Sequence, residues 1–450
     1  NPLTYLNIRN GDTDQVTNFN ATNTHLSCIE TLNPDYATAN WTSANGNIDT
    51  LVTFSFLCGS QNQNVWHISS TTGSDGNGRG TFESPFSTIQ MGINIADEGN
   101  TVSVMEGRYV ENIDFTGKSI RVNGSGPELT VIDGDSTGSV VVMDSGEDST
   151  TVLSGFTITN GASNYGAGLY IKNGASPILE DLRISSNHAN TAGAGMYVWN
   201  DAKVHIRNMH IYDNEAGGSG GGILIGSESE LTISDAHIYD NTSGNSGGGM
   251  MIGATSTVTV EHAVIVGNSA LKGGGIASKT GSSTFHHATV SDNSASGEGN
   301  GIYLRLNAEM VIHNSIVTAN DSDVVFIDDS LSTLDISYSN IEGGWPGEGN
   351  IDADPLFCDP ESGDYHLAVN SSSVGAGQDG YDMGASGVGC DVINDAPVAY
   401  DADVFTDENT PVTITLNGDD INGDYFTFEV VEEPGNGNLS SHGQYLNFDG

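Results

Sequence analysis

Apolar residues return along this chain at a nearly constant interval of about 27 positions, in short runs that alternate with polar residues. Two such series are Ile184, Ile211, Ile238, Ile265, Val290, Val317 and Leu179, Ile206, Ile233, Val260, Phe285, Ile312. Two more are Leu169, Met196, Ile223, Met250, Ile276, Ile302 and Ile171, Val198, Ile225, Ile252, Ser278, Leu304. Alternation with period two predicts short β-strands, and a fixed interval of this size is typical of stacked units.

Glycine and asparagine recur between these strands. The repeated residues are Gly168, Gly195, Gly222, Gly249, Gly275 and Gly301, and Asn187, Asn214, Asn241, Asn268, Asn293 and Asn320. Glycine suits a corner where φ is positive or where stacking excludes a Cβ, and equivalent amides can hydrogen-bond from coil to coil. The pattern predicts a parallel β-solenoid with three strands per coil of about 27 residues, its apolar columns inside the tube.

These repeats resemble the right-handed parallel β-helix of the pectate-lyase-like superfamily, and more specifically the right-handed β-helix repeat proteins of bacterial surfaces. The resemblance covers residues 65–392. It implies a capping segment over 65–135, regular coils over 150–330 and an exit module over 335–392.

A short helix is expected in the capping segment. Ser84 and Pro85 suit its N-cap and first position, and Ile89, Ile93 and Ala96 would then share one face. Such a helix would close the open end of the tube and protect its terminal strand edge.

The two ends of the chain differ in pattern from the repeats. Residues 1–60 resemble the end of a bacterial leucine-rich-repeat array. Residues 395–450 carry no Lys or Arg and resemble the cadherin-like, immunoglobulin-type modules of bacterial surface proteins. The predicted fold is therefore all-β: a right-handed parallel β-helix with an N-terminal capping helix and a partial β-sandwich at the C-terminal end.

The net charge of the chain limits the kinds of molecule that it is expected to bind. It has 58 acidic residues against 12 Lys plus Arg, for a formal net charge of −46. A negative field of this size argues against nucleic acid and anionic lipid. No apolar run approaches the roughly 18–20 residues that span a bilayer, so no membrane insertion is expected in this segment. Because both ends read as mid-domain, we expect a monomeric module within a longer protein.

The four cysteines fall in two local pairs, Cys28 with Cys58 and Cys358 with Cys390. Neither pair has CxxC spacing, which makes zinc binding through them unfavourable. One disulfide in each end region is the natural expectation, although spacing alone does not settle the pairing. Disulfides favour an oxidising setting, so the predicted location is extracellular or the cell surface.

Aromatic and basic residues gather at outward-facing positions of the repeats. The candidates are Tyr170, Tyr197, Trp199, Tyr303 and Lys172 beside the glycines, and His210, Tyr212, His237 and Tyr239 beside the asparagines. Aromatic rings stack on sugar rings while polar neighbours fix orientation, so these residues are candidates for contact with a polysaccharide or cell-surface glycan. Exposed strand positions also favour Tyr and His by propensity, which leaves a purely structural role as the alternative.

Two groups offer ligands for metal ions, although no cofactor is required. The acidic end supplies oxygen ligands suited to calcium at Asp419, Asp420, Asn422 and Asp424, or simply a polar turn. The second group is His262 and His287 with Asp235, in one column of successive coils. Because stacking alone spaces such residues by about 5 Å, a complete ligand set there would need a second column.

Catalysis has weaker sequence support. Lys279 and Arg305 fall in one column on adjacent coils, where a base and a carboxylate-neutralising cation of a uronate lyase could meet. The G-x-S-x-G phrase at 244–248 repeats a corner of the preceding coil and lacks the strand-to-helix context of a nucleophile. Near-uniform coils favour a rigid module for adhesion or carbohydrate contact, with no catalysis required. The alternative is a polysaccharide lyase or glycoside hydrolase acting on an acidic polysaccharide.

Overall fold

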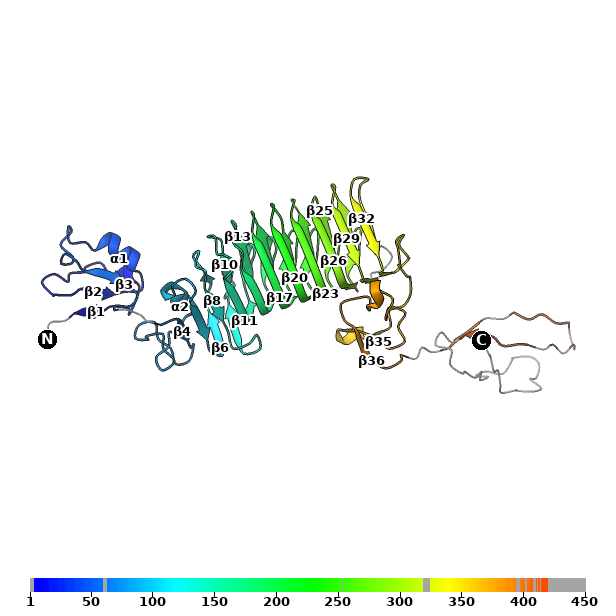
Figure 1. The fold of residues 1–450 in the computed structure, drawn as a ribbon, viewed down its shortest axis with the longest axis horizontal. Helices are drawn as coiled ribbons and strands as arrows, with labels where there is room; N and C mark the ends of the chain where they lie inside the picture. Colours follow the sequence, from blue (N-terminus) through cyan, green and yellow to red (C-terminus); the bar gives the residue numbers. More distant parts are fainter. Residues whose placement is uncertain are drawn as a thin grey trace.

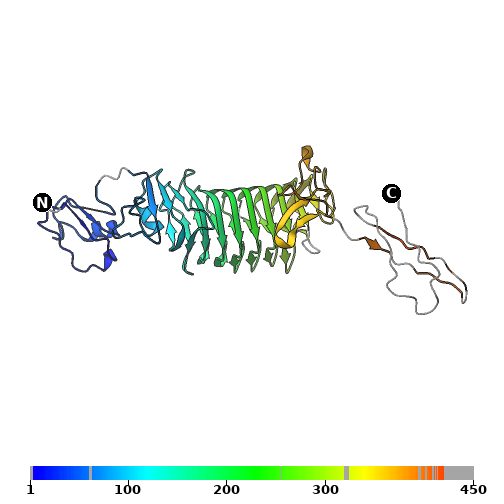
Figure 2. The same ribbon diagram turned by 90° about the horizontal axis from the view of Figure 1, so that it is seen from below.

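The computed structural model describes residues 4–59, 63–253, 255–318 and 324–393, together with 397–400, 403–407, 410, 412 and 414–419. Most of these residues form a parallel β-solenoid, and a smaller unit precedes it (Figure 1). Strands of successive coils lie side by side along the tube, as the view from below also shows (Figure 2). The predicted all-β solenoid is therefore confirmed.

Three parallel sheets run along the tube, and the two smaller ones have nine and six strands. The nine-stranded sheet contains β7 (Ile113–Asp114), β10 (Val141–Met143), β13 (Leu169–Lys172), β16 (Met196–Trp199), β19 (Ile223–Ile225), β22 (Met250–Gly253), β25 (Ile276–Lys279), β28 (Ile302–Arg305) and β31 (Val325–Ile327). The six-stranded sheet contains β12 (Ala162–Tyr165), β15 (His188–Ala192), β18 (Glu215–Ala216), β21 (Thr242–Ser243), β24 (Ser269–Ala270) and β27 (Ser294–Ala295).

The third sheet, called here the long sheet, has fifteen strands. Its main path contains β4 (Val65–Ile68), β5 (Thr101–Val104), β8 (Arg121–Asn123), β11 (Val152–Thr159), β14 (Ile178–Ser185), β17 (Lys203–Tyr212), β20 (Glu230–Tyr239), β23 (Thr257–Val266), β26 (Ser282–Ser291), β29 (Glu309–His313) and β32 (Thr333–Ser337). Beside that path lie β6 (Gly107–Val110), β9 (Thr130–Asp133), β30 (Ile316–Thr318) and β33 (Asn340–Ile341). Each regular coil thus contributes one strand to each of three sheets.

The apolar columns stack in the predicted register. Ile184 pairs with Ile211 and Ile211 with Ile238 on the long sheet, and Leu169 pairs with Met196 on the nine-stranded sheet. These side chains are fully buried in one continuous core. Since side chains alternate across a strand, the residues between them face outward and are free to differ.

The corners also take the predicted form. Gly220 has φ of 71°, and a Cβ on Gly222 would lie 2.6 Å from the carbonyl oxygen of Gly249 in the next coil. Four hydrogen bonds between side-chain amides link the asparagines from Asn187 to Asn293, at Nδ2–Oδ1 distances of 2.9, 2.9, 3.0 and 3.0 Å. Asn320 lies outside the described residues.

The capping helix begins later than predicted. Helix α2 (Ile89–Ile95) has Thr88 as its N-cap, whose hydroxyl accepts a hydrogen bond from the Met91 amide. Ser84 and Pro85 do not cap it, because the chain at Phe86 is still extended and pairs with the backbone of β4. Ile89 and Ile93 are buried in the solenoid core, so the expected apolar face is present.

Smaller units flank the solenoid. The first has three parallel strands, β1 (Tyr5–Asn7), β2 (Cys28–Glu30) and β3 (Thr53–Ser55), with η1 (Thr13–Gln15) and helix α1 (Pro34–Asn40). The exit module has β34 (Phe357–Asp359), β35 (Asp364–Ala368) and β36 (Val388–Cys390), with η2 (Pro360–Ser362) and η3 (Gln378–Gly380). Beyond it, β37 (Val398–Ala399) pairs with β38 (Gly418–Asp419).

Both expected disulfides are present, joining Cys28 to Cys58 and Cys358 to Cys390. The helices α1 and α2 have seven residues each, and within the described part of the chain no helix is long and apolar enough to cross a membrane.

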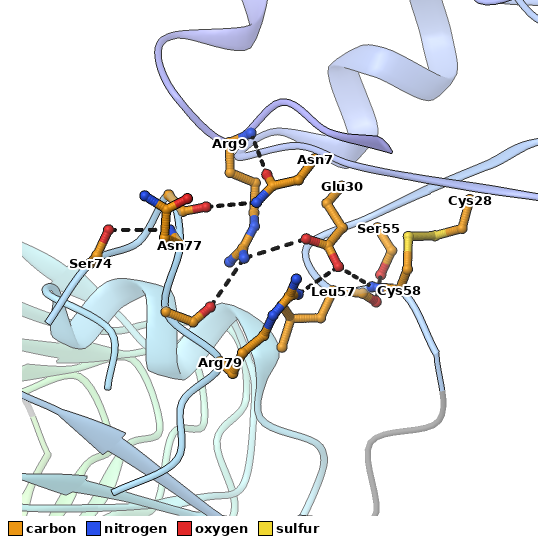
Figure 3. A network of polar contacts seen from close by, with 12 residues as sticks. Asn7, Arg9, Cys28, Glu30, Ser55, Leu57, Cys58, Ser74, Asn77 and Arg79 are labelled. Carbon is orange, nitrogen blue, oxygen red and sulfur yellow. Dashed lines mark hydrogen bonds and ion pairs between the residues drawn. A yellow bond between two sulfur atoms is a disulfide. The ribbon is translucent and has the colours of Figure 1, made fainter. Parts of the chain in front are cut away.

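A buried polar network joins the N-terminal unit to the capping segment (Figure 3). Glu30 of β2 lies between two arginines, with 3.4 Å from Oε2 to Arg9 Nη2 and 2.7 Å from Oε1 to Arg79 Nη1. Arg9 also donates to the carbonyl of Gly78 at 3.1 Å. Burial lowers the pKa of Arg9, and the charge of Glu30 opposes that shift. The N-terminal unit and the capping segment are therefore joined by specific polar contacts in addition to the covalent connection of the backbone.

Candidate functional site

An aromatic patch covers part of the outward face of the nine-stranded sheet, over β13 and β16. It consists of Tyr170, Tyr197 and Trp199, which point away from the core because they alternate with buried aliphatic residues of β13 and β16. The ring centroids of Tyr170 and Tyr197 lie 5.7 Å apart, and those of Tyr197 and Trp199 lie 5.4 Å apart, both stacked. Tyr197 is 9% exposed and supports the half-buried rings of its two neighbours.

Lys172 lies at the edge of the aromatic patch. Its ammonium is 4.8 Å from the centroid of the Tyr170 ring and 3.6 Å from the carboxylate of Asp144. A hydrogen bond with the Tyr170 side chain raises the pKa of Lys172, and the negative charge of Asp144 raises it further. The cation is thus held beside the rings, in the arrangement expected of a cation–π contact.

Lys279 and Arg305 form a cation pair further along the same face. The two residues are partners in the register of β25 and β28. Eight of the twelve cations of the chain form ion pairs with carboxylates, and Lys118 donates to three backbone carbonyls. Within the described residues, neither Lys279 nor Arg305 has an ion-pair or side-chain hydrogen-bond partner.

Tyr303 does not belong to the exposed surface predicted for it. Its side chain is 1% exposed, because the ring stacks on Phe326 of the next coil at 5.9 Å. Its hydroxyl donates to Asp328 at 2.6 Å and accepts from Lys272 at 3.3 Å. Burial, followed by the bond to Asp328, raises the pKa of Tyr303. A sugar cannot reach this ring, so its role here is packing.

The other candidate aromatics form two rows on the long sheet. His210 stacks on His237 with 4.9 Å between ring centroids, and Tyr212 stacks on Tyr239, also at 4.9 Å. The exit module lies over part of these rows and leaves a hollow of about 530 Å³ that Tyr365 completes. Burial lowers the pKa of His237, and burial followed by Tyr212 raises the pKa of Tyr239 to about 12. Burial thus disfavours the charged form of both groups.

A second, acidic hollow was not foreseen from the sequence. It has a volume of about 680 Å³, and Asp292, Glu342, Asp352 and Asp354 are among the residues that line it. The hydroxyl of Tyr365 donates to Asp292 at 2.8 Å and thereby links the exit module to the residue that follows β26. These acids lie up to 62 positions apart in the sequence, so no local spacing marks them as neighbours.

His262 and His287 meet as predicted, but with a different acidic partner. Their rings stack at 5.0 Å, and Glu261 rather than Asp235 brings a carboxylate within 4.8 Å of a ligand atom of each. Burial, followed by the charge of His262, lowers the pKa of His287. Glu261 lies outside the column that contains His262 and His287, so it provides a possible ligand from a second column, as a complete ligand set needs.

The calcium ligands predicted at the acidic end are only partly described. Asp419 belongs to β38, and its carboxylate accepts a hydrogen bond from the Tyr400 hydroxyl. Asp420, Asn422 and Asp424 lie outside the described residues, so calcium binding there stays a prediction.

Residues 120–295 match the family model described as "Right handed beta helix region". This stretch of the chain is a right-handed β-helix. No curated protein sequence matches the chain.

Two solved structures are similar to parts of this chain. One is described as the complex structure of XylC with xylose, at 11% identity and a TM-score of 0.34, over 65% of this chain and 87% of that chain. The other is the A-module of the mannuronan C-5 epimerase AlgE4 of Azotobacter vinelandii, at 15% identity and a TM-score of 0.38, over 56% and 81%. At these values neither likeness bears on activity.

The β-helix therefore separates the predicted surface residues into two groups. Tyr170, Trp199 and Lys172 share the outward face of the nine-stranded sheet with the cation pair. The His–Tyr rows lie on the long sheet, partly under the exit module. The hollows at the exit module include His237 but neither Lys279 nor Arg305.

Proposed function

We propose that this chain is a rigid carbohydrate-contacting module of a large secreted or cell-surface bacterial protein, with no catalysis required. The observation that carries the proposal is the cation pair. The chain has a net charge of −46, yet Lys279 and Arg305 have no carboxylate partner among the residues that the structure describes, and they share an outward face with stacked aromatic rings. Carboxylates or sulfates of an acidic glycan are the groups that such a pair would bind.

The spacing along the face suits an extended ligand. One outward column contains, in successive coils, Lys172, Trp199, Gly226, Gly253, Lys279 and Arg305. With about 4.8 Å between coils, the column spans roughly 24 Å. The Trp199 ring lies over Gly226, where a Cβ would come within 2.4 Å of it, whereas a Cβ on Gly253 would meet nothing closer than 3.8 Å. The column is therefore low at Gly253, between the Trp199 ring and the cation pair. A sugar chain along the axis would stack on Trp199 and place acidic groups on the cation pair.

Other features support the location and the mechanical role. Two disulfides favour an extracellular setting. The parallel strands of the N-terminal unit fit the resemblance to a leucine-rich-repeat end, and the acidic C-terminal stretch resembles a cadherin-like module. The network at Glu30 would transmit force between the first unit and the β-helix. A chain of such modules is typical of bacterial surface proteins.

A polysaccharide lyase is the second candidate, favoured by the same two residues. A lysine base and an arginine that neutralises a uronate carboxylate could act together from neighbouring coils. However, they lie on an outward sheet face and do not line the hollows at the exit module. Binding without turnover is the function that this position supports better.

The test compares binding of alginate, pectate and chondroitin sulfate oligosaccharides to the full chain and to a double variant, Lys279→Ala with Arg305→Ala. We expect binding at least about ten-fold weaker, measured by titration calorimetry, because two charge-assisted contacts are lost. The matched control is Lys203→Ala with Arg207→Ala, which removes the same charge from the long sheet. Gly253→Glu should also weaken binding, because a side chain fits there without close contact and would neutralise Lys279.

Absorbance of unsaturated uronate, followed in the same samples, separates the two candidates. Product formation that the double variant abolishes would establish the lyase instead. Equal binding by the double variant and the control variant would remove the cation pair from the site.

A further inference from the structure

A separate cluster of potential ligands lies between the long sheet and the exit module. It consists of Glu261 and His262 of β23 and His287 of β26, and we call it the His–Glu cluster. One ligand atom of each residue lies within 4.8 Å of those of the other two. The imidazole rings are nearly parallel, at an interplanar angle of 12°. Two nitrogens and one carboxylate oxygen thus lie near one another.

The fold does not need histidine at these positions. Both residues have left-handed backbone, with φ of 54° at His262 and 49° at His287. The same column contains Asp181, Asn208, Asp235 and Asn314, all with φ between 48° and 60°. Asn and Asp tolerate this conformation well and satisfy the corner in the other coils. Two adjacent histidines beside a glutamate therefore point to a role other than turning the corner.

The hydrogen bonding of the two rings is incomplete in a way that suits ligation. Neither ring nitrogen of His287 has a hydrogen-bond partner, although both are shielded from solvent. Buried polar atoms normally have a partner, so these two are exceptions that need a reason. His262 Nδ1 lies 3.4 Å from the carbonyl of Ala385 in the exit module. A proton on Nδ1 would leave Nε2 as a free donor of its lone pair, the usual state of a ligating imidazole.

We propose that Glu261, His262 and His287 bind a divalent transition-metal ion, for which zinc is the best match. Two imidazoles and one carboxylate form a ligand set that zinc accepts, whereas calcium and magnesium prefer oxygen ligands alone. Small rotations of the two rings would bring their nitrogens to the roughly 2.0–2.1 Å of a zinc–nitrogen bond. Glu261 and His262 are exposed, so a fourth position stays open to water or to another ligand.

The experiment titrates the full chain with cobalt, whose visible absorption reports a site with few ligands, and then displaces cobalt with zinc. Excess calcium is present throughout to occupy the surface carboxylates. We expect one equivalent of cobalt to bind and zinc to displace it. His287→Asn should weaken this binding at least ten-fold and keep the fold, because Asn208 and Asn314 occupy the same column. Glu261→Gln, an exposed and nearly isosteric change, should weaken it as well.

The chain supplies its own control. His210 and His237 stack with almost the same geometry, at 4.9 Å and 14°, but the His–Glu cluster is the one group of three possible ligands found among the described residues. His237→Asn should therefore leave cobalt binding unchanged. Equal affinity of the wild type and both His–Glu cluster variants, or no cobalt binding by the wild type in the presence of calcium, would overturn the proposal.

Discussion

Replacement of Glu30 by alanine should lower the free energy of unfolding of the N-terminal unit by about 3–5 kcal/mol, because it leaves the Arg9 guanidinium buried without its counter-ion. The side chains of Arg9 and Glu30 are 0% and 1% exposed. Glu30 Oε1 also accepts a hydrogen bond from the Cys58 amide at 3.0 Å, which the substitution removes too. Hydrogen exchange of peptides covering β1 and β2, monitored by mass spectrometry, would measure the loss.

The control for this experiment is an exposed ion pair between adjacent coils. Lys203 and Glu230 lie 2.8 Å apart but are 47% and 57% exposed, so Glu230→Ala should cost much less stability than Glu30→Ala. A double variant, Arg9→Met with Glu30→Leu, should recover much of the lost stability, because it removes the buried charges together. Similar costs for Glu30→Ala and Glu230→Ala would show that the buried network contributes little.

Replacement of Asn241 by alanine should destabilise the middle coils by about 3–5 kcal/mol, because five hydrogen bonds of a buried amide are lost and their partners stay unpaired. Its Nδ2 donates to the carbonyls of Ile211 and Tyr239 and to Asn268 Oδ1 at 2.8, 3.0 and 3.0 Å. Its Oδ1 accepts from the backbone and side-chain amides of Asn214 at 3.2 and 2.9 Å. Urea denaturation followed by circular dichroism would measure the change.

Two further variants separate hydrogen bonding from loss of volume. Asn241→Asp keeps the shape but removes the donors and adds a buried charge, so it should destabilise at least as much as alanine. Asn190 is exposed and makes one side-chain bond, to Asn164 at 3.2 Å, so Asn190→Ala should cost less than about 0.5 kcal/mol. A mild effect of Asn241→Asp would mean that packing, not the amide ladder, stabilises these corners.

The solenoid could be predicted from the sequence because each coil repeats the same local requirements. The column through Ile184 and Ile211, the corner at Gly222 and the ladder through Asn241 all follow from one interval. No such signal exists where the chain departs from the repeat. Beside His262 and His287, the nearby carboxylate is that of Glu261 rather than that of Asp235. Tyr303 is buried because Phe326 of the following coil stacks on its ring.

Contacts between distant segments explain the remaining differences. Tyr365 bonds to Asp292 across 73 positions, and His262 approaches Ala385 across 123. Neither separation is a multiple of the repeat, so the hollows beneath the exit module could not be placed from periodicity. Arg79 and Glu30 likewise meet across 49 positions, without a pattern that marks them. The neighbouring positions of Lys279 and Arg305 could be predicted because the two residues belong to one column.

The amide ladder also has a genetic consequence. The five coils from Gly168 to Asn293 each have their own corner glycine and their own asparagine, so they meet their neighbours through the same contacts. Unequal crossing-over between such similar segments would remove or add entire coils while both capped ends stay intact. The length of the solenoid along its axis would then differ between related proteins in steps of about 4.8 Å, the spacing of one coil.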